Sequence, residues 1–179
     1  GFRFTDDSLH VAMIGKDDKG QRYSSLIIAS VDTTSSDKEK IKEIEEQEEE
    51  GEKDKKNKVK YKKTEIDFGR LHSSIDWSQD NRYLVYSKFH YANNSSMVWD
   101  LCVYDTELEK KSWITNNMRA TYPIFKKNNE IIFVAHQNSI SNLFKIDITD
   151  NKISQLTDFT DNTQIISPSI SKDKNILSF

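Results

Sequence analysis

Four segments of the chain repeat one short pattern, and this repetition constrains the fold more than any other feature of the sequence. In each copy an apolar residue is followed by a polar turn and then by a second apolar run. Asp or Asn stands at the centre of every turn, at Asp7, Asp80, Asn128 and Asp173. These side chains bond nearby backbone groups and tolerate left-handed conformations, so they suit tight turns. Each copy therefore predicts a strand, a turn and a strand.

A second pattern follows the first three copies and ends in Asp each time. Its members are Ile28–Asp32, Leu101–Asp105 and Leu143–Asp147. In the last two the chain continues through a polar turn to an apolar run that ends in Thr, ten positions after the Asp in both cases. Strand-forming runs on either side of a short polar turn predict β-hairpins.

The spacing of the turn residues gives the repeat length. Asn128 and Asp173 are 45 residues apart, and Asp80 and Asn128 are 48 apart. Asp7 and Asp80 are 73 apart, which indicates an insertion of about 22 residues in the first repeat. Four short strands in a repeat of about 45 residues are typical of β-propellers. The sequence therefore predicts an all-β, partial β-propeller with about 3.5 four-stranded antiparallel blades.

We expect one incomplete propeller domain, divided by the repeats into successive blades. Their ranges are 1–72 for the first blade, with the insertion at about 36–60, then 73–120 for the second, 121–164 for the third and 165–179 for the start of the fourth. The last copy stops at Phe179 after its second strand, and the chain opens on Gly1 instead of methionine. We therefore expect a fragment or a trimmed product.

Charge is concentrated in the insertion. Residues 37–63 contain ten acidic residues and ten lysines, the acids mainly in the first half and the lysines mainly in the second. Such a segment is typical of a solvated loop at a hairpin tip. Alternatively, its two halves pair and dock a charged partner. The whole chain has a net charge of −3, which argues against nucleic acid as a partner. No apolar run reaches the roughly 20 residues of a transmembrane segment.

The sequence shows no catalytic or metal-binding motif. It has no Gly-x-Ser-x-Gly elbow, no phosphate-binding glycine loop and only one cysteine, Cys102. The four histidines, at positions 10, 72, 90 and 136, have no spacing typical of metal ligands. We therefore predict no catalytic residue, no cofactor and no metal in this chain.

One segment has the composition of a partner-binding loop. Residues 88–99 are expected to connect the second and third strands of the second blade and combine aromatic and amide side chains. The candidate contact residues are Phe89, His90, Tyr91, Asn93, Asn94 and Trp99. The alternative is that the aromatic residues close the core of their own blade. Trp77 and Phe125 share one repeat position and are expected in the core between blades.

The repeats resemble those of the TolB-like propellers, also called WD40-like or PD40 repeats. Ser78–Arg82 and Ser171–Asn175 are similar to the Ser-Pro-Asp-Gly-Lys turn of that family, with its Pro and Gly replaced. Residues 142–157 resemble its outer hairpin. The resemblance covers nearly the whole chain except the insertion, and it implies a ring of six to eight blades.

The resemblance also implies a choice of functions. TolB is periplasmic and binds partners of the Tol–Pal system, so the leading hypothesis is a non-catalytic scaffold that binds a protein or peptide. It implies an extracytoplasmic location, in the periplasm or on the surface of a bacterium. Alternatively, this is the gating propeller of a prolyl-oligopeptidase-like or tricorn-like serine protease whose catalytic domain lies outside the chain.

Overall fold

A computed structural model describes residues 1–7, 9–16, 23–31, 61–93 and 95–179, and within them the chain forms only strands and turns. Each of the first three sheets has four strands, and every neighbouring pair is antiparallel. The first sheet runs β1 (Phe2–Phe4), β2 (His10–Gly15), β3 (Ser24–Val31) and β4 (Tyr61–Gly69). The second runs β5 (Leu71–Trp77), β6 (Tyr83–Tyr91), β7 (Met97–Asp105) and β8 (Lys110–Trp113).

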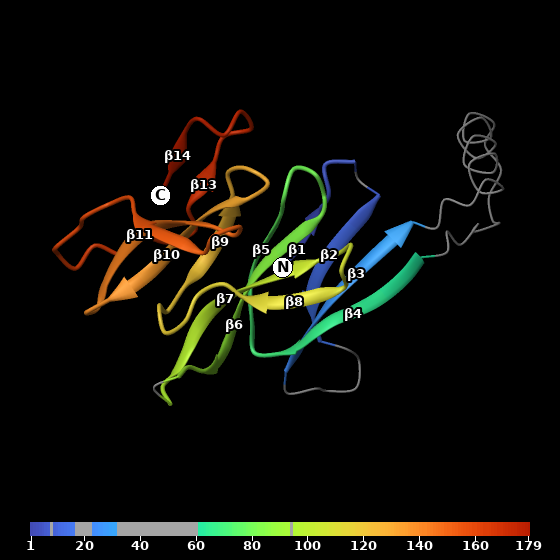
Figure 1. The fold of residues 1–179 in the computed structure, drawn as a ribbon, viewed down its shortest axis with the longest axis horizontal. Coiled ribbons are helices and arrows are strands. Elements are labelled where there is room, and N and C mark those ends of the chain that lie inside the picture. The colour runs from blue at the N-terminus through green and yellow to red at the C-terminus, as the bar shows by residue number, and fades with distance from the viewer. Residues whose placement is uncertain (8, 17–22, 32–60, 94) are drawn as a thin grey trace, which may run out of the picture.

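The third sheet repeats this arrangement and a smaller fourth sheet follows it (Figure 1). The third contains β9 (Thr121–Phe125), β10 (Glu130–Gln137), β11 (Ile140–Asp147) and β12 (Lys152–Gln155). The fourth contains β13 (Ser169–Ile170) and β14 (Leu177–Ser178). The chain is thus a partial propeller of three four-stranded blades and a two-stranded start of another, as the repeats predict.

The proposed blade boundaries can be placed beside these sheets. β5 begins at Leu71, so its first two residues lie within the range 1–72 assigned to the first blade. The expected insertion at about 36–60 lies outside the described residues.

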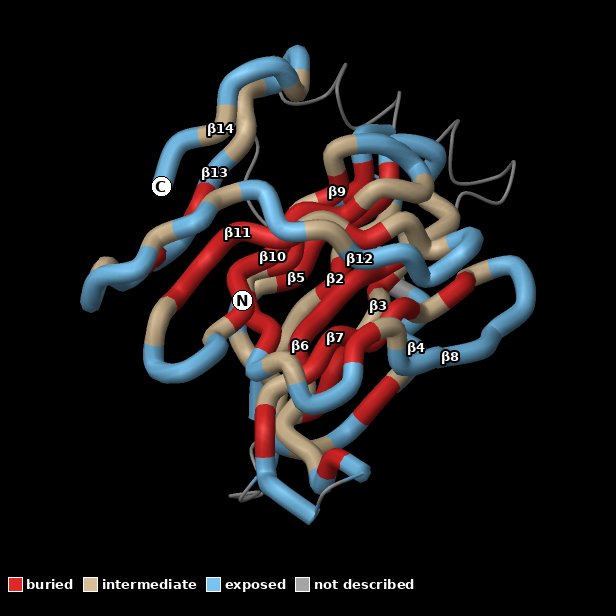
Figure 2. The backbone as a smooth tube through the Cα atoms, turned by 60° about the vertical axis from the view of Figure 1, so that its left-hand side comes forward, coloured by how far each residue is buried: buried red, intermediate tan, exposed pale blue. Residues whose placement is uncertain are grey.

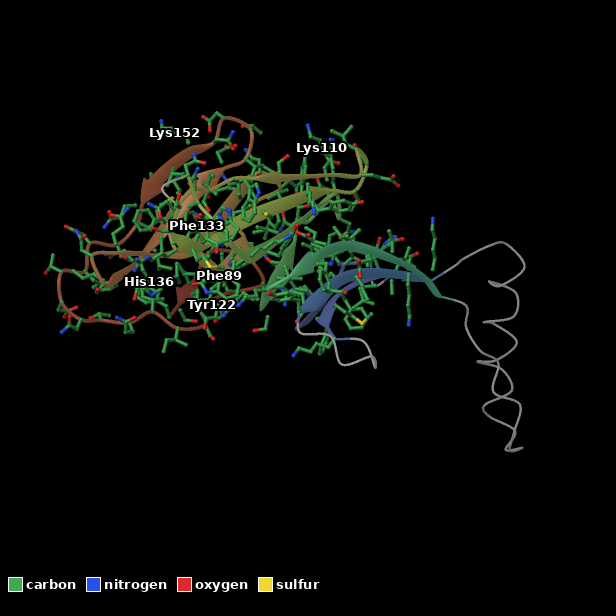
Figure 3. The ribbon with its side chains drawn as sticks, turned by 90° about the horizontal axis from the view of Figure 1, so that it is seen from below. Phe89, Lys110, Tyr122, Phe133, His136 and Lys152 are labelled. Atoms are coloured by element: carbon green, nitrogen blue, oxygen red, sulfur yellow. The ribbon has the colours of Figure 1, made fainter. Side chains whose placement is uncertain are left out.

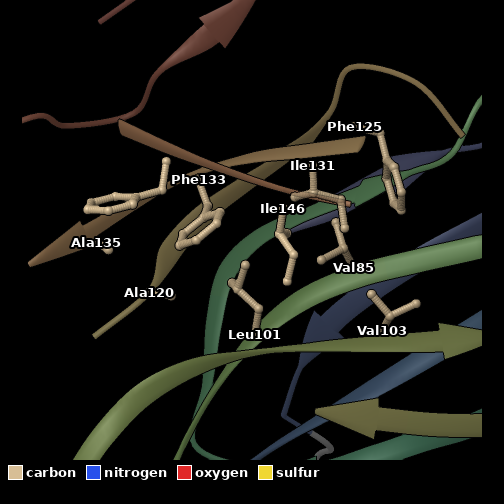
Figure 4. Close-up of a cluster of buried hydrophobic side chains, with 10 residues drawn as sticks. Val85, Leu101, Val103, Ala120, Phe125, Ile131, Phe133, Ala135 and Ile146 are labelled. Atoms are coloured by element: carbon tan, nitrogen blue, oxygen red, sulfur yellow. The ribbon is translucent and has the colours of Figure 1, made fainter. Parts of the chain in front are cut away.

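The core lies between the sheets, because each sheet packs its faces on its neighbours. A cluster between the second and third sheets joins Val85, Leu101 and Val103 to Phe125 and Phe133 (Figure 4). A second cluster, between the first and second sheets, joins Leu26 to Trp77 and Tyr86. Trp77 and Phe125 therefore occupy the core between blades, as their shared repeat position predicts. Figure 2 shows this burial along the middle strands of each sheet.

Strand alternation explains why the middle strands are apolar on both faces. Successive side chains of a strand point to opposite faces of the sheet. In β6, Leu84 and Tyr86 enter the cluster facing the first sheet, whereas Val85 enters the cluster facing the third. Strands buried on both sides read as continuous apolar runs, as residues 84–86 of β6 and residues 131–135 of β10 do here.

The antiparallel meander divides the connections between two opposite faces of the molecule. The β6–β7 turn lies on one face with the β4–β5, β8–β9 and β10–β11 connections, and we call this the β6–β7 face. The opposite face carries the β5–β6, β7–β8, β9–β10 and β11–β12 turns. Strands β1, β5 and β9 are the innermost of their sheets, because they contact one another from blade to blade.

Candidate binding surface

Two innermost strands contain β-bulges near the β6–β7 face. In β5, Leu71 pairs with Lys88 and Ile75 pairs with Tyr86, so three residues of β5 lie opposite one residue of β6. In β9, Ile124 pairs with Ile132 of β10, and Thr121 pairs with Val134. Two residues of β9 therefore lie opposite one residue of β10. Bulges bend a strand and redirect its side chains.

The bulges bring His72 of β5 and Tyr122 of β9 together. Tyr122 has a φ of 53°, in the left-handed region that a bulky residue rarely adopts. Its ring centroid is 4.7 Å from that of His72, and the two rings meet edge to face. Backbone strain of this kind persists only where the surrounding structure holds it, and it is concentrated at functional sites.

His72 and Tyr122 belong to a larger aromatic cluster, which also contains Arg70, Phe89 and Trp99. The Trp99 ring lies 5.6 Å from His72 and 5.2 Å from Phe89, between centroids. The Arg70 guanidinium carbon is 4.4 Å from the centroid of the Phe89 ring. Burial lowers the pKa of His72, so its imidazole is neutral at pH 7.

Beside the aromatic cluster lies a pocket of about 350 Å³, which we call the Arg119 pocket. Its walls are mainly apolar, and its charged or titratable members are Arg119 and His136. It is lined by Phe89, Met97, Val98, Trp99, Arg119, Thr121, His136 and Ser139. Arg119 also has a left-handed φ, of 52°. Its carbonyl oxygen is 3.4 Å from Nδ1 of His136.

A second pocket, of about 580 Å³, opens on the same blade, and we call it the Tyr91 pocket. Its central feature is the His90 ring stacked on Trp113, with centroids 3.8 Å apart and planes inclined by 21°. His90 Nε2 is 2.9 Å from Oδ2 of the buried Asp100, which fixes the orientation of the imidazole. Tyr91 is 71% exposed and Trp113 is 44% exposed, so both aromatic rings offer surface to a partner.

The structure places the six candidate contact residues differently from the sequence expectation. Phe89, His90 and Tyr91 lie in β6 and Trp99 lies in β7, so the expected loop over 88–99 is wrong. The strands continue because Phe89 pairs with Trp99 and Tyr91 pairs with Met97.

The connection itself is short. Asn93 lies in the turn, and Asn94 lies outside the described residues.

The paired strands divide these candidates between the two pockets. Phe89 and Trp99 line the Arg119 pocket, whereas His90, Tyr91 and Asn93 line the Tyr91 pocket. In Figure 3, Phe89, Tyr122 and His136 gather on one side of the molecule, with Lys110 and Lys152 on the opposite side.

Three of the contributing residues were not found from the sequence as contact residues. Arg119 and Trp113 reach these pockets from the β8–β9 connection and from the outer strand β8, and Tyr122 joins the neighbouring aromatic cluster through the bulge in β9. Only the aromatic character of Trp113 and Tyr122 could have indicated a contact role from the sequence. The bulge could not be predicted, because it depends on the register of β9 against β10.

Comparison with solved structures identifies the architecture. TolB from Acinetobacter baumannii matches 99% of this chain with a TM-score of 0.64 at 10% sequence identity, over 37% of its own length. A TolB from Agrobacterium tumefaciens matches 88% of the chain with a TM-score of 0.54 at 15% identity, over 46% of its length. The fold is that of a TolB-like β-propeller. The chain spans less than half of either TolB structure.

Propeller-containing peptidases share the same fold. A structure from a study of two prolyl endopeptidases matches 95% of this TolB-like propeller with a TM-score of 0.57 at 12% identity, over 23% of its own chain. No protein-family model matches the sequence. A search of curated proteins finds no match either.

The repeated turns of the TolB-like propeller lie on the face opposite the pockets. In three of them the Asp accepts a hydrogen bond from a Ser or Thr hydroxyl two residues earlier and from a backbone N–H two residues later. These turns contain Asp7, Asp80 and Asp173. Asn128 instead accepts a hydrogen bond from the backbone N–H of Asp80, at 3.1 Å, and so links two blades. These contacts give the turn residues a structural role.

Burial and hydrogen bonds set the protonation of Cys102 and Asp67 inside the TolB-like propeller. Burial raises the pKa of the Cys102 thiol to about 12, so the thiol stays protonated. The pKa of Asp67 is lowered. Burial alone would raise it, but hydrogen bonds from Lys111, Lys88 and Tyr86 outweigh the effect of burial. This arrangement joins the first blade to the second, because Asp67 belongs to β4 and its three donors belong to the second sheet.

No group of three or more His, Cys, Asp or Glu side chains among the described residues is arranged to hold a metal ion. Those residues also include no helix that is long and apolar enough to cross a membrane.

Proposed function

We propose that this chain is part of a non-catalytic scaffold, and that it binds a protein or peptide segment on its β6–β7 face. The observation that carries the proposal is the pair of pockets on either side of the β6–β7 ribbon. Both contain aromatic side chains with exposed surface, next to amide, hydroxyl or guanidinium groups. Aromatic and arginine side chains with such partial exposure are enriched among the residues that dominate protein binding.

A peptide selection tests the proposal. Random peptides displayed on phage are selected on the purified chain, and the affinity of the enriched peptides is measured by isothermal titration calorimetry. The double variant Tyr91→Ala/Trp113→Ala is expected to weaken binding at least about tenfold. Leu108→Ala is the matched control, since Leu108 is 68% exposed but lies in the β7–β8 turn on the opposite face. No enriched peptide, or equal loss in the control, would overturn the proposal.

The same preparation tests the absence of catalysis. We expect no turnover of chromogenic esters or of prolyl and acylaminoacyl peptide substrates, because the chain carries no nucleophile motif. Turnover that survives repurification and is lost on substitution of a described side chain would contradict this expectation.

The alternative is a propeller that gates a serine protease. It is favoured by the match to the prolyl endopeptidase structure, of which this chain covers 23%. Sequencing the gene on both sides of this region discriminates the two functions. An α/β-hydrolase domain, or a PDZ domain followed by a protease domain, would favour the gate, and the absence of a protease domain would favour the scaffold.

We also propose an extracytoplasmic location, which rests on the resemblance to TolB. Cell fractionation of the source organism, followed by immunodetection, is expected to find the protein in the periplasm or at the surface. Detection in the cytoplasmic fraction alone would contradict this location.

A further inference from the structure

The Arg119 pocket combines an apolar wall with a cationic group. Its wall is formed by Phe89, Met97, Val98 and Trp99 from the paired strands β6 and β7. Arg119 approaches from the β8–β9 connection, and His136 from the end of β10. An apolar surface beside a cationic side chain favours a ligand that carries an apolar group and a negative charge close together.

Charge around the pocket is not balanced within the protein. None of the lining residues is acidic. The Arg119 guanidinium forms no ion pair or hydrogen bond with any residue that the structure describes. Arg70 adds a second guanidinium nearby, above the Phe89 ring.

Two buried aspartates, one in the first blade and one in the second, already have partners. Asp67 accepts from two lysines, and Asp100 accepts from Thr115 and two backbone N–H groups. An anionic ligand would therefore meet no carboxylate in the Arg119 pocket among the described residues.

The size of the pocket limits how much of a ligand it can hold. Its volume of about 350 Å³ is at the lower end of the range for ligand pockets, roughly 300–1,000 Å³. The β10–β11 turn borders it, with Asn138 and Ser139 both in the left-handed region at φ values of 50° and 66°. This is the geometry of a tight two-residue hairpin turn, which gives the pocket a rigid edge.

We propose that the Arg119 pocket binds the free C-terminus of a polypeptide partner whose last residue is bulky and apolar. This proposal rests on the proposed scaffold function and names the part of the partner that the scaffold recognises. The terminal carboxylate faces Arg119, and the last side chain packs against Phe89, Met97 and Trp99.

The covalent structure of a C-terminal residue explains why it fits better than an acidic side chain. A C-terminal Leu or Phe carries its carboxylate and its apolar group on the same Cα atom. An internal Asp or Glu supplies a carboxylate without an apolar group on the same residue. The pocket combines an apolar wall with Arg119, whose guanidinium has no partner among the described residues, and this combination matches the C-terminal arrangement.

Matched synthetic peptides test this proposal. The probe is a fluorescein-labelled octapeptide pool with seven random positions and a fixed C-terminal Phe, prepared as the free acid and as the amide. Fluorescence polarisation with the whole chain is expected to show binding of the acid, and binding roughly tenfold weaker for the amide. A third pool ending in Lys as the free acid is expected to bind as weakly as the amide, because it lacks the apolar group.

Variants assign the effect to the pocket. Arg119→Gln is expected to weaken binding of the acid pool roughly tenfold and to abolish the difference between acid and amide. Met97→Ser removes an apolar side chain that is 45% exposed, and it is expected to lower the preference for Phe over Lys at the C-terminus. Lys152→Gln is the matched control for loss of a positive charge, since Lys152 lies on the opposite side of the molecule (Figure 3) and is expected to bind like the wild type.

The outcomes separate this proposal from the scaffold function. Equal binding of acid and amide that is lost in Tyr91→Ala/Trp113→Ala would overturn C-terminal recognition and leave the scaffold function standing. Binding by none of these pools would overturn C-terminal recognition, while the phage selection decides the scaffold function independently. Binding of fluorescein-labelled decanoate more tightly than the Phe acid pool would show that the pocket takes small organic carboxylates, which also overturns the proposal.

Discussion

The carboxylate of Asp76 accepts a hydrogen bond from the backbone N–H of Phe125, 2.8 Å away, and this bond joins the innermost strand of one blade to that of the next. Its other oxygen accepts from Arg3 Nε of β1, also across a blade boundary, at 2.9 Å. Burial raises the pKa of Asp76, although the positive charge of Arg3 opposes this effect. One buried side chain thus connects three successive inner strands.

Substitution of Asp76 is therefore expected to reduce stability. Asp76→Ala leaves the buried Phe125 N–H without an acceptor, which should lower the free energy of unfolding by about 2–4 kcal/mol. Asp76→Asn keeps one acceptor oxygen and is expected to cost about half as much. Urea titrations followed by tryptophan fluorescence measure both values, with Asp150→Ala in the exposed β11–β12 turn as the control. Equal, small losses in all three variants would show that the bridge contributes little.

Two threonines at corresponding repeat positions are expected to stabilise the outer strands. Thr115 Oγ1 accepts from the backbone N–H of Leu101 at 2.8 Å and donates to Asp100 at 2.8 Å. Thr157 makes the same pair of contacts with Leu143 and Asn142, at 2.9 and 2.8 Å.

Replacement of either threonine by Val should lower the free energy of unfolding by about 1–3 kcal/mol. The loss should be larger for Thr115→Val, since its partner is a buried carboxylate. Thermal melts test this order, and Thr64→Val on an exposed part of β4 is the control. A stabilising effect at either position would show that the hydroxyl is dispensable there.

The sequence predicts these hairpins well because the turn spacing is local. The ten-residue interval that ends at Thr115 recurs at Thr157, and the structure pairs the strands of both hairpins. The His72–Tyr122 contact could not be predicted in this way. It depends on bulges in β5 and β9, and a bulge is defined by the register against a partner strand.

The extent of β6 and β7 was mispredicted for a related reason. A segment that mixes polar and aromatic residues favours a loop, but Phe89 and Trp99 pair across the strands and extend the ribbon. Aromatic residues favour strands when a cross-strand partner is present. Composition gives no information about that partner, so the division of the candidate residues between two pockets emerged only from the structure.

His72 is expected to make stability depend on pH. Burial lowers its folded-state pKa below the ordinary value of 6.5, and its Nδ1 accepts a hydrogen bond from the backbone N–H of Ser74 at 3.2 Å. The unfolded chain therefore binds the proton more tightly, so this contribution is complete above pH 6.5 and is lost as the pH falls through the folded-state pKa. Melting temperatures measured from pH 8 to pH 5 should fall less steeply in His72→Phe than in the wild type. Parallel profiles for the two proteins would contradict the prediction.

The hairpin formed by β3 and β4 is expected to gain stability when its connection is shortened. Val31 and Tyr61 form the last pair of the β3–β4 ladder, next to residues 32–60. The two ends of this connection are therefore as close together as the residues that flank a short hairpin turn. The cost of closing a loop grows slowly with its length, and shortening this connection from 29 residues to two corresponds to roughly 2 kcal/mol of closure entropy. Replacement of residues 32–60 by Asn-Gly, a sequence that favours two-residue hairpin turns, is therefore expected to raise the free energy of unfolding by about that amount.

A scrambled sequence of the same length and composition at 32–60 is the control, and it should leave stability unchanged. Loss of stability in both variants would show that the native segment makes stabilising contacts, and it would also overturn the expectation that this insertion is a solvated loop.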